Sequence, residues 1–323
     1  MSQTRRIEFI DLAKGVCILL VVLRHVGINI PIFDFLRMPL YFILSGLFFK
    51  TYGGGKNFIL KKINKILIPF LFFYIISYIA YYIIHYTLPE LPLEDYNGLQ
   101  DLFVQHTLFN APIWFLLCLF WVNVLFCIIT MAANNEILRF FFVIALCAIG
   151  FVLHIIEVFV PLCLDSSLIA LPFFYIGFHL KKTYLLYDSS KMWIDVLIII
   201  TGLLVIISTA FFPIKVDIHH NSIDIYAYLM SSYGVITLLL VCKYIKYIPI
   251  ISYIGRYSII VLCVHHLIQR PTKVVVGYFV NIDGISNIIS FIIVITLSTL
   301  LISPCIKYIP YFVAQKDLLN KNI

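Results

Sequence analysis

Apolar residues fall in long blocks along this chain, and short polar breaks separate the blocks. A helix needs about 20 predominantly apolar residues to cross the hydrocarbon of a bilayer. The pattern predicts spans at 10–29, 35–50, 66–88, 112–131, 138–160, 166–180, 193–213, 224–242, 250–269 and 286–308. We therefore expect an all-α fold, a polytopic membrane helix bundle of about ten transmembrane helices.

Composition supports this fold class and excludes a water-soluble protein. Hydrophobic residues make up 62% of the 323 positions, charged residues only 12%, and the mean hydropathy is +1.03. Soluble domains carry about a quarter charged residues. We expect one integral membrane domain over 1–323, with short cytoplasmic tails at 1–9 and 309–323. The longest segment outside the membrane is expected at 89–111.

The positive charges are placed as in a membrane protein, so the net charge of +7 does not indicate nucleic-acid binding. With a cytoplasmic N-terminus, three basic residues fall in outer segments: Lys215, Arg270 and Lys273. Sixteen fall in inner segments: Arg5, Arg6, Lys50, Lys56, Lys61, Lys62, Lys65, Arg139, Lys181, Lys182, Lys191, Lys243, Lys246, Lys307, Lys316 and Lys321. This bias follows the positive-inside rule and predicts that both termini are cytoplasmic.

The eight cysteines have no CxxC spacing and sit mostly inside the predicted spans. Isolated cysteines in apolar segments behave as small hydrophobic side chains. We therefore expect them to pack in the bundle, without disulfides or a zinc site.

The first span contains four ionisable residues, Asp11, Lys14, Arg24 and His25. Such groups are costly inside a membrane, so each suggests a functional role. At about 100° per residue, Lys14 and His25 lie within about 20° of each other, with His25 about 16 Å further outward. Asp11 and Lys14 are equally compatible with a structural pair near the interface, and Arg24 with an anchor at the outer headgroups.

Further polar residues are predicted near the outer ends of other spans. Arg37 opens the second span, His85 closes the third, and Ser258, His265 and Gln269 share a face of the ninth, with His266 beside them. If these spans surround the first, they enclose a polar pocket that opens outward. No acidic residue accompanies these histidines at ligand spacing, so we expect no metal site. His219 and His220 are expected to be solvated in an outer loop.

The inner segment 50–65 holds five lysines and no acidic residue. Attraction to anionic lipid explains such a cluster, and so does binding of an anionic cytoplasmic cosubstrate. The sequence leaves both interpretations open.

Five segments of the chain, in order, resemble motifs of the acyltransferase-3 family of integral membrane acyltransferases. They are Ile10–Gly15 with Arg24 and His25, Met38–Phe42 with Leu44–Gly46, Lys62 and Lys65 before Ile68 and Pro69, Ile113–Leu116, and Gly255–Ser258 followed by His265. Lys62 and Lys65 stand where the family often has arginines, which removes bidentate phosphate recognition but keeps the charge. Leu262 stands where a tyrosine is common.

The resemblance implies transfer of an acyl group, usually acetyl from cytoplasmic acetyl-CoA, to a hydroxyl of an extracytoplasmic glycan or lipid-linked sugar. Within the family, the chain resembles the polysaccharide O-acetyltransferase type without an extracytoplasmic esterase-like domain. It implies acyl-CoA as a cosubstrate with no bound cofactor, a cell-membrane location, and separate glycan-assembly proteins as partners.

The resemblance also implies roles for individual residues. His25 is the expected catalytic residue, either as general base or as carrier of the acyl group. Donor binding or orientation is expected of Asp11, Lys14, Lys62 and Lys65. Acceptor binding or thioester stabilisation is expected of Arg37, Ser45, Trp114, Ser258 and His265.

A secondary transporter is the alternative, because charged residues inside ten helices also describe a carrier. Transporters often contain two related halves with helices broken at matching positions. Pro39 and Pro172 are not flanked by similar sequence, so the chain shows no such pairing. The lysine-rich inner segment also has no evident role in a carrier.

Overall fold

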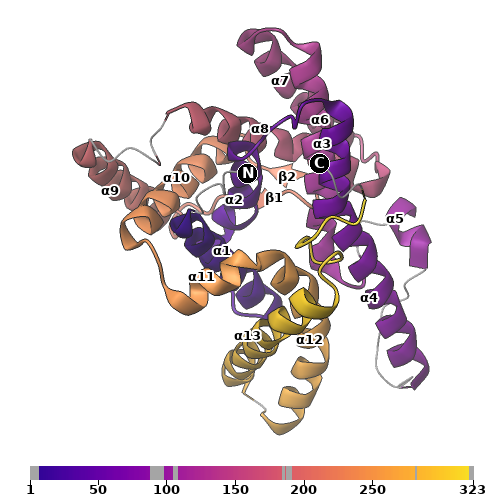
Figure 1. The fold of residues 1–323 in the computed structure, drawn as a ribbon. Coiled ribbons are helices and arrows are strands. Elements are labelled where there is room, and N and C mark those ends of the chain that lie inside the picture. The colour runs from indigo at the N-terminus through magenta and orange to yellow at the C-terminus, as the bar shows by residue number, and fades with distance from the viewer. Residues whose placement is uncertain are drawn as a thin grey trace.

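The computed structural model describes residues 7–87, 98–104, 108–183, 186, 191–280 and 282–319, and almost all of them are helical (Figure 1). The α-helices are α1 (Glu8–Val26), α2 (Asp34–Leu47), α3 (Gly55–Lys62), α4 (Ile68–Thr87), α5 (Asp101–Val104), α6 (Trp114–Ala132), α7 (Glu136–Ile155), α8 (Leu164–Leu180), α9 (Met192–Ser208), α10 (Ala227–Ile245), α11 (Pro249–Arg256), α12 (Ser258–Phe279) and α13 (Asp283–Tyr308). The short turns are η1 (Pro31–Phe33), the π-helix η2 (Ile63–Leu67), η3 (Gly98–Gln100), η4 (Ala111–Ile113), η5 (Pro161–Cys163) and η6 (Lys181–Thr183). Strands β1 (Val216–Asp217) and β2 (Ser222–Ile223) pair antiparallel.

Among the described residues, seven helical stretches are long and apolar enough to cross a membrane, by length and composition. They are Gly55–Thr87, Ala111–Ala132, Glu136–Ile155, Pro161–Thr183, Ala227–Ile245, Ser258–Phe279 and Asp283–Tyr308. Helix α9 is a shorter apolar helix, α2 has 14 residues, and α1 carries Glu8, Asp11, Lys14 and Arg24. These three helices lie at positions where the sequence predicted spans, but they are not among the seven. The predicted all-α polytopic fold is confirmed.

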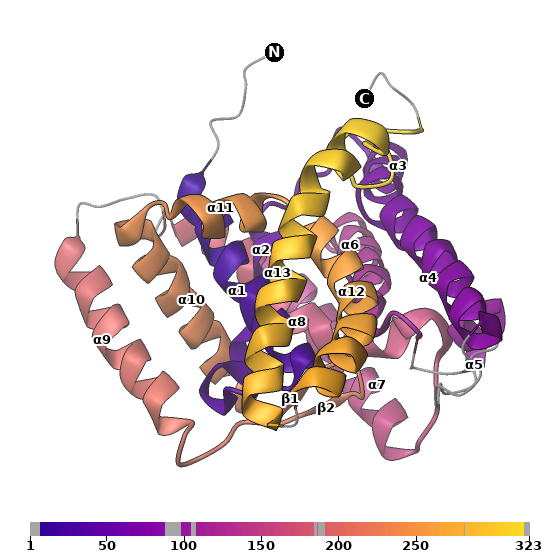
Figure 2. The same ribbon diagram turned by 90° about the horizontal axis from the view of Figure 1, so that it is seen from below.

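The two ends of the bundle differ in what they present. Helix α1 begins and α13 ends at the same end, where α3 and α11 also lie, while β1 and β2 lie at the other end (Figure 2). We call the first the inner end and the second the outer end, following the distribution of lysines and arginines.

Helix α1 packs against α11 at backbone contact. A Cβ on Gly255 would lie 1.8 Å from the Asp11 carbonyl oxygen, and one on Gly15 would lie 2.0 Å from that of Ile251. Helices α2 and α8 approach equally closely, because Gly46 of α2 faces the α8 backbone and Gly177 of α8 faces the α2 backbone. Small residues allow membrane helices to approach in this way, so these glycines fix where α1 and α2 stand.

The structure corrects two of the predicted elements near the site. The span expected at 250–269 is two helices, since α11 ends at Arg256 and α12 begins at Ser258 and continues to Phe279. Arg270 and Lys273, expected in an outer loop, are therefore helical. The lysine-rich segment is also helical from Gly55, and it continues through η2 into α4. Most of the outer segment 89–111, and the tail residues 1–6 and 320–323, lie outside the described residues.

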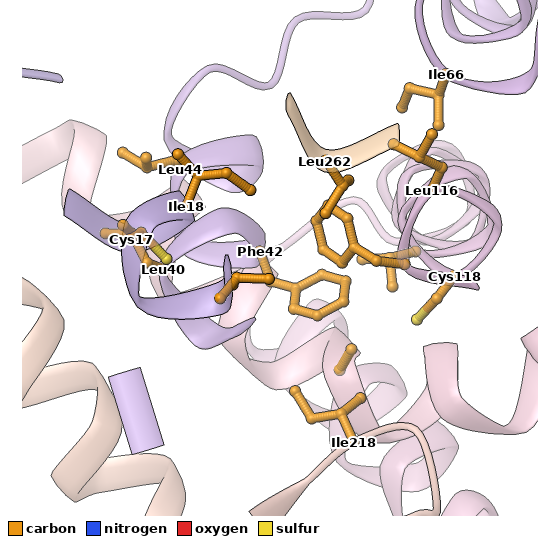
Figure 3. Packing of buried hydrophobic residues seen from close by; sticks show 14 of the residues in the cluster. Cys17, Ile18, Leu40, Phe42, Leu44, Ile66, Leu116, Cys118, Ile218 and Leu262 are labelled. Carbon is orange, nitrogen blue, oxygen red and sulfur yellow. The ribbon is translucent and has the colours of Figure 1, made fainter. Parts of the chain in front are cut away.

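The core confirms the expected use of cysteine, because all eight are free and buried. Cys17 and Cys118 pack with Phe42 and Leu40 in the centre of the bundle (Figure 3). Ile218, which lies between β1 and β2, points into the same core and is 2% exposed. The outer hairpin thus closes part of the outer end.

Candidate active site

A cavity of about 290 Å³ opens between α1, α2, η2, α6 and α12. Its lining combines lysines, hydroxyl side chains and apolar rings: Lys14, Tyr41, Leu44, Ser45, Phe48, Tyr52, Lys62, Lys65, Ile66, Phe115, Leu116, Leu119, Ser258, Ile259 and Leu262. Lys65 contacts the chain just beyond α13, so its part of the cavity lies at the inner end. We call this space the inner cavity.

Three lysines from distant parts of the sequence line the inner cavity. Lys14 comes from α1, Lys62 from the end of α3, and Lys65 from η2. The Lys62 Nζ lies 5.3 Å from the centre of the Phe58 ring, and no carboxylate of the described residues pairs with it. Lys65 is paired with Asp317 at 2.9 Å. The cavity is therefore suited to an anionic ligand that enters from the inner end.

His25, His265 and His266 do not line the cavity, but the two histidines of α12 lie about one helical turn beyond one of its lining residues. Leu262 lines it on α12, and His265 and His266 follow three and four residues later. At 1.5 Å per residue, these histidines lie about 5–6 Å further along the helix. The cavity and the histidines are thus neighbouring parts of one site.

His25 faces both histidines of α12. Its ring centre lies 5.3 Å from that of His265 and 5.4 Å from that of His266. His25 is half-buried, His265 is fully buried, and His266 is 8% exposed. The sequence predicted a polar pocket here only if these helices surround α1, and the structure brings the His25 and His265 rings together.

A backbone hydrogen bond sets the tautomer of His265. Its Nδ1 lies 2.8 Å from the Val261 carbonyl oxygen, which can only accept, so Nδ1 carries the proton. In the neutral ring Nε2 is then unprotonated, and it is buried without a partner among the described residues. The Nδ1 of His266 is also buried and unpartnered there. Buried polar atoms are normally hydrogen-bonded, so these two nitrogens are available to form hydrogen bonds with a substrate.

Arg37 stands at the start of α2, close to His25. It forms an ion pair with Asp34 at 3.0 Å, and its carbonyl accepts a hydrogen bond from the Cys17 thiol at 2.8 Å. The positive charges of Arg37 and Arg24 lie close enough to His25 to interact electrostatically with its ring. Arg37 is therefore part of the site, as the sequence suggested, with Asp34 as an additional partner.

The remaining predicted residues divide between the cavity and its surroundings. Ser45 lines the cavity and accepts a hydrogen bond from the buried Asn123 amide at 3.1 Å. Ser258 lines the inner cavity too, about two helical turns inward from the histidines with which it was grouped. Asp11 does not line the cavity, and its backbone packs on Gly255 instead.

Trp114 stacks on His219, with ring centres 4.5 Å apart and planes at 23°. His219 was expected in solvent, but the outer hairpin folds onto the bundle and half-buries it. His85 is exposed and stacks on Tyr81, and no ring contact joins it to the cluster in the described part of the chain.

Sequence reasoning missed part of the α2 face of the cavity. Tyr41, Leu44, Ser45 and Phe48 line it together, and the Tyr41 hydroxyl donates to the Lys14 carbonyl at 3.1 Å. These positions follow helical spacing from Ser45, so the periodicity of α2 could have identified them.

No group of three or more histidine, cysteine, aspartate or glutamate side chains within the described ranges is arranged to hold a metal ion.

Comparison with known proteins identifies one family. The family model Acyl_transf_3, described as an acyltransferase domain, matches residues 7–307. Neither a curated protein nor a solved structure matches the chain.

Proposed function

The chain belongs to the acyltransferase-3 family of membrane acyltransferases, and we propose that it transfers an acetyl group from cytoplasmic acetyl-CoA to a hydroxyl of an extracytoplasmic cell-envelope glycan. It is a multi-pass membrane protein, and the plasma membrane is the proposed location. The acceptor is supplied by separate glycan-assembly proteins.

One observation carries this proposal: a lysine-lined cavity at the inner end includes Leu262, which lies about one helical turn from a cluster of three histidines. Coenzyme A is anionic and cytoplasmic, which fits Lys62 and Lys65 at the mouth. The acyl end of its thin pantetheine arm would reach past Phe115 and Leu262 toward His25. Lys14 lines the wall along this route and orients the donor, while Asp11 fixes α1 against α11.

In the proposed step, His25 removes the proton of the acceptor hydroxyl, whose oxygen attacks the thioester carbonyl carbon. A carbon–oxygen bond forms and the carbon–sulfur bond breaks, and the departing thiolate takes up the proton. His25 also supports an alternative in which its imidazole first accepts the acyl group and then passes it to the hydroxyl. Both routes use the same residue.

The neighbours of His25 have distinct parts in this step. The unprotonated Nε2 of His265 accepts a hydrogen bond and thereby orients the hydroxyl or the imidazole. Arg37 stabilises the negative charge that develops on the thioester oxygen. Ser45 and Ser258 contact the arm of the donor, and Trp114 with His219 borders the acceptor side.

The test compares cells that lack the protein with cells that express the wild type, His25→Ala or His85→Ala. We expect an acetyl mass increment on surface glycans with the wild type and with His85→Ala, and none with His25→Ala. Membranes should release free coenzyme A from acetyl-CoA in the same pattern.

If His25→Ala retains full modification, the role of His25 is wrong although the transferase remains. If no glycan changes while the wild type moves a small molecule across the membrane without a covalent product, the protein acts as a carrier and the proposed reaction is wrong.

A further inference from the structure

The segment that follows α13 returns onto the lysine-rich part of the chain. Phe312 stacks on Phe72 of α4, with ring centres 4.5 Å apart and planes at 21°. Val313 beside it is fully buried. We call residues 309–319 the C-terminal segment, and these two side chains attach it to the bundle next to the inner cavity.

Asn64 fixes the end of the C-terminal segment. It lies in the π-helix η2, is 2% exposed, and accepts hydrogen bonds at Oδ1 from the backbone N–H groups of Leu318 and Leu319, both at 2.8 Å. Its Nδ2 donates to the carbonyls of Leu60 and Leu319, both at 2.9 Å. A buried amide with this many backbone bonds defines one position for the segment. π-Helical turns often occur at functional sites.

This attachment places the Asp317 carboxylate between two lysines. It pairs with Lys61 at 2.7 Å and with Lys65 at 2.9 Å, and Lys65 also donates to the Ala314 carbonyl at 2.7 Å. Lys65 is one of the residues that line the inner cavity. The C-terminal segment thus holds an internal anion at the mouth of the site.

The Asp317 carboxyl is ionised at neutral pH. Burial raises its pKa, but Lys61 and Lys65 outweigh burial, so the pKa lies below the usual value for aspartate. A carboxyl whose pKa is lower in the folded state stabilises the folded protein at every pH above its unfolded pKa of about 3.9. This stabilisation is lost only as the pH falls through the folded-state pKa. Near pH 7, protonation of Asp317 therefore does not break its contacts with the two lysines.

We propose that Lys61 and Lys65 form a phosphate-binding site for the nucleotide part of the acyl donor, and that the Asp317 carboxylate occupies this site until the donor displaces it. The inference rests on the proposed use of acyl-CoA. It adds Lys61 to the donor site and gives the C-terminal segment a regulatory role.

Charge and exposure support displacement. Lys62, which no described carboxylate pairs with, attracts the donor first. The ion pairs of Asp317 are partly exposed, with side-chain exposures of 17% for Asp317, 24% for Lys61 and 31% for Lys65. Such pairs are individually weak in water. A phosphate group, which carries more charge than one carboxylate, can replace Asp317 on the same two ammonium groups.

The experiment measures equilibrium binding of radiolabelled acetyl-CoA to the purified full-length protein. Variants are Asp317→Asn, Asp317→Glu, Lys61→Ala and the double variant Lys61→Ala with Asp317→Asn. Asp283→Asn is the matched control, because it removes an exposed aspartate at the outer end of α13, the helix that precedes the C-terminal segment. Thermal unfolding in detergent checks that each variant is folded.

We expect Asp317→Asn to lower the Kd for acetyl-CoA by about three- to tenfold, since it frees two cations. Asp317→Glu and Asp283→Asn should bind like the wild type. Lys61→Ala should weaken binding, and the double variant should lose most of the gain. If Asp317→Asn is unstable, Asp317→Ser replaces it, because it also removes the carboxylate and keeps the Leu318 and Leu319 backbone groups bonded to Asn64.

Equal or weaker binding by a folded Asp317→Asn protein would show that the C-terminal segment is only structural. Absence of acetyl-CoA binding to the wild type and to every variant would instead contradict the proposed donor, and with it this inference.

Discussion

His265 and His25 differ in the hydrogen bonds that surround them. The Val261 carbonyl fixes the proton of His265 on Nδ1. The Nε2 atom of this fully buried ring has no hydrogen-bond partner among the described residues. His25 is half-buried and stands between this ring and that of His266. A residue that reacts needs access to substrate, whereas a residue that orients it benefits from being fixed. This contrast supports the proposed catalytic role of His25 and the proposed positioning role of His265.

Replacing the His265 ring by a phenyl ring tests that assignment. We expect His265→Phe to lower kcat of acetyl transfer by about a hundredfold, because it retains the ring shape but removes both nitrogens. The KM for acetyl-CoA should change little, since the lysines bind the donor. His85→Phe, at an exposed position, is the control. Activity within about threefold of the wild type would mean that His265 only fills space.

Helix contacts decide where the charged residues of α1 stand. Gly255 lets the α11 backbone meet the carbonyl of Asp11, and the chain then turns at Tyr257 into α12. This break lets Ser258 line the cavity at one end of α12 while His265 faces α1 further along. The site depends on this close contact as much as on its polar residues.

The close contact gives a stability prediction. Gly255→Ala places a Cβ 1.8 Å from the Asp11 carbonyl oxygen and 2.4 Å from the Gly15 nitrogen, both backbone atoms that cannot rotate away. We expect the free energy of unfolding to fall by about 1–3 kcal/mol and the Tm in detergent by roughly 3–10 °C. Gly277→Ala should leave the Tm unchanged, because no atom lies within 4 Å of its Cβ position. Equal Tm values for the two variants would refute the packing argument.

The whole molecule separates a cationic inner end from an outer end that a hairpin partly closes. Helix α1 begins and α13 ends at the inner end, beside the lysine-rich segment (Figure 2). Lysines and arginines are retained on the cytoplasmic side of membrane proteins, which orients the bundle. A donor from the cytoplasm and an acceptor from outside would then reach His25 from opposite ends.

Cysteine labelling tests this orientation. All eight native cysteines are buried, so a membrane-impermeant maleimide should not label the wild type. We expect Ile225→Cys, at a position 79% exposed near the outer hairpin, to be labelled in intact cells. Lys56→Cys, on exposed α3, should be labelled only after the membrane is permeabilised. The reverse pattern would invert the topology and exclude a cytoplasmic donor at the lysines.

The sequence by itself determined the fold class and the orientation expected for the bundle. The length of an apolar segment decides locally whether it can span a membrane, and the positive charges of the loops together set the orientation. Both can be read from the sequence without knowing which helices are in contact. The acyltransferase-3 motifs likewise identified the family from short segments such as Ile10–Gly15. His25 stood out for the same reason, because a polar residue within an apolar block is visible in one dimension.

Only the tertiary structure decided which residues share the site. The break at Tyr257 separates α11 from α12, and the glycine contacts bring α11 onto α1. Asp317 reaches Lys61 from the other end of the chain, at a sequence separation that no periodicity encodes. Such contacts arise from how surfaces of distant segments fit together, so they appear only when the helices are packed.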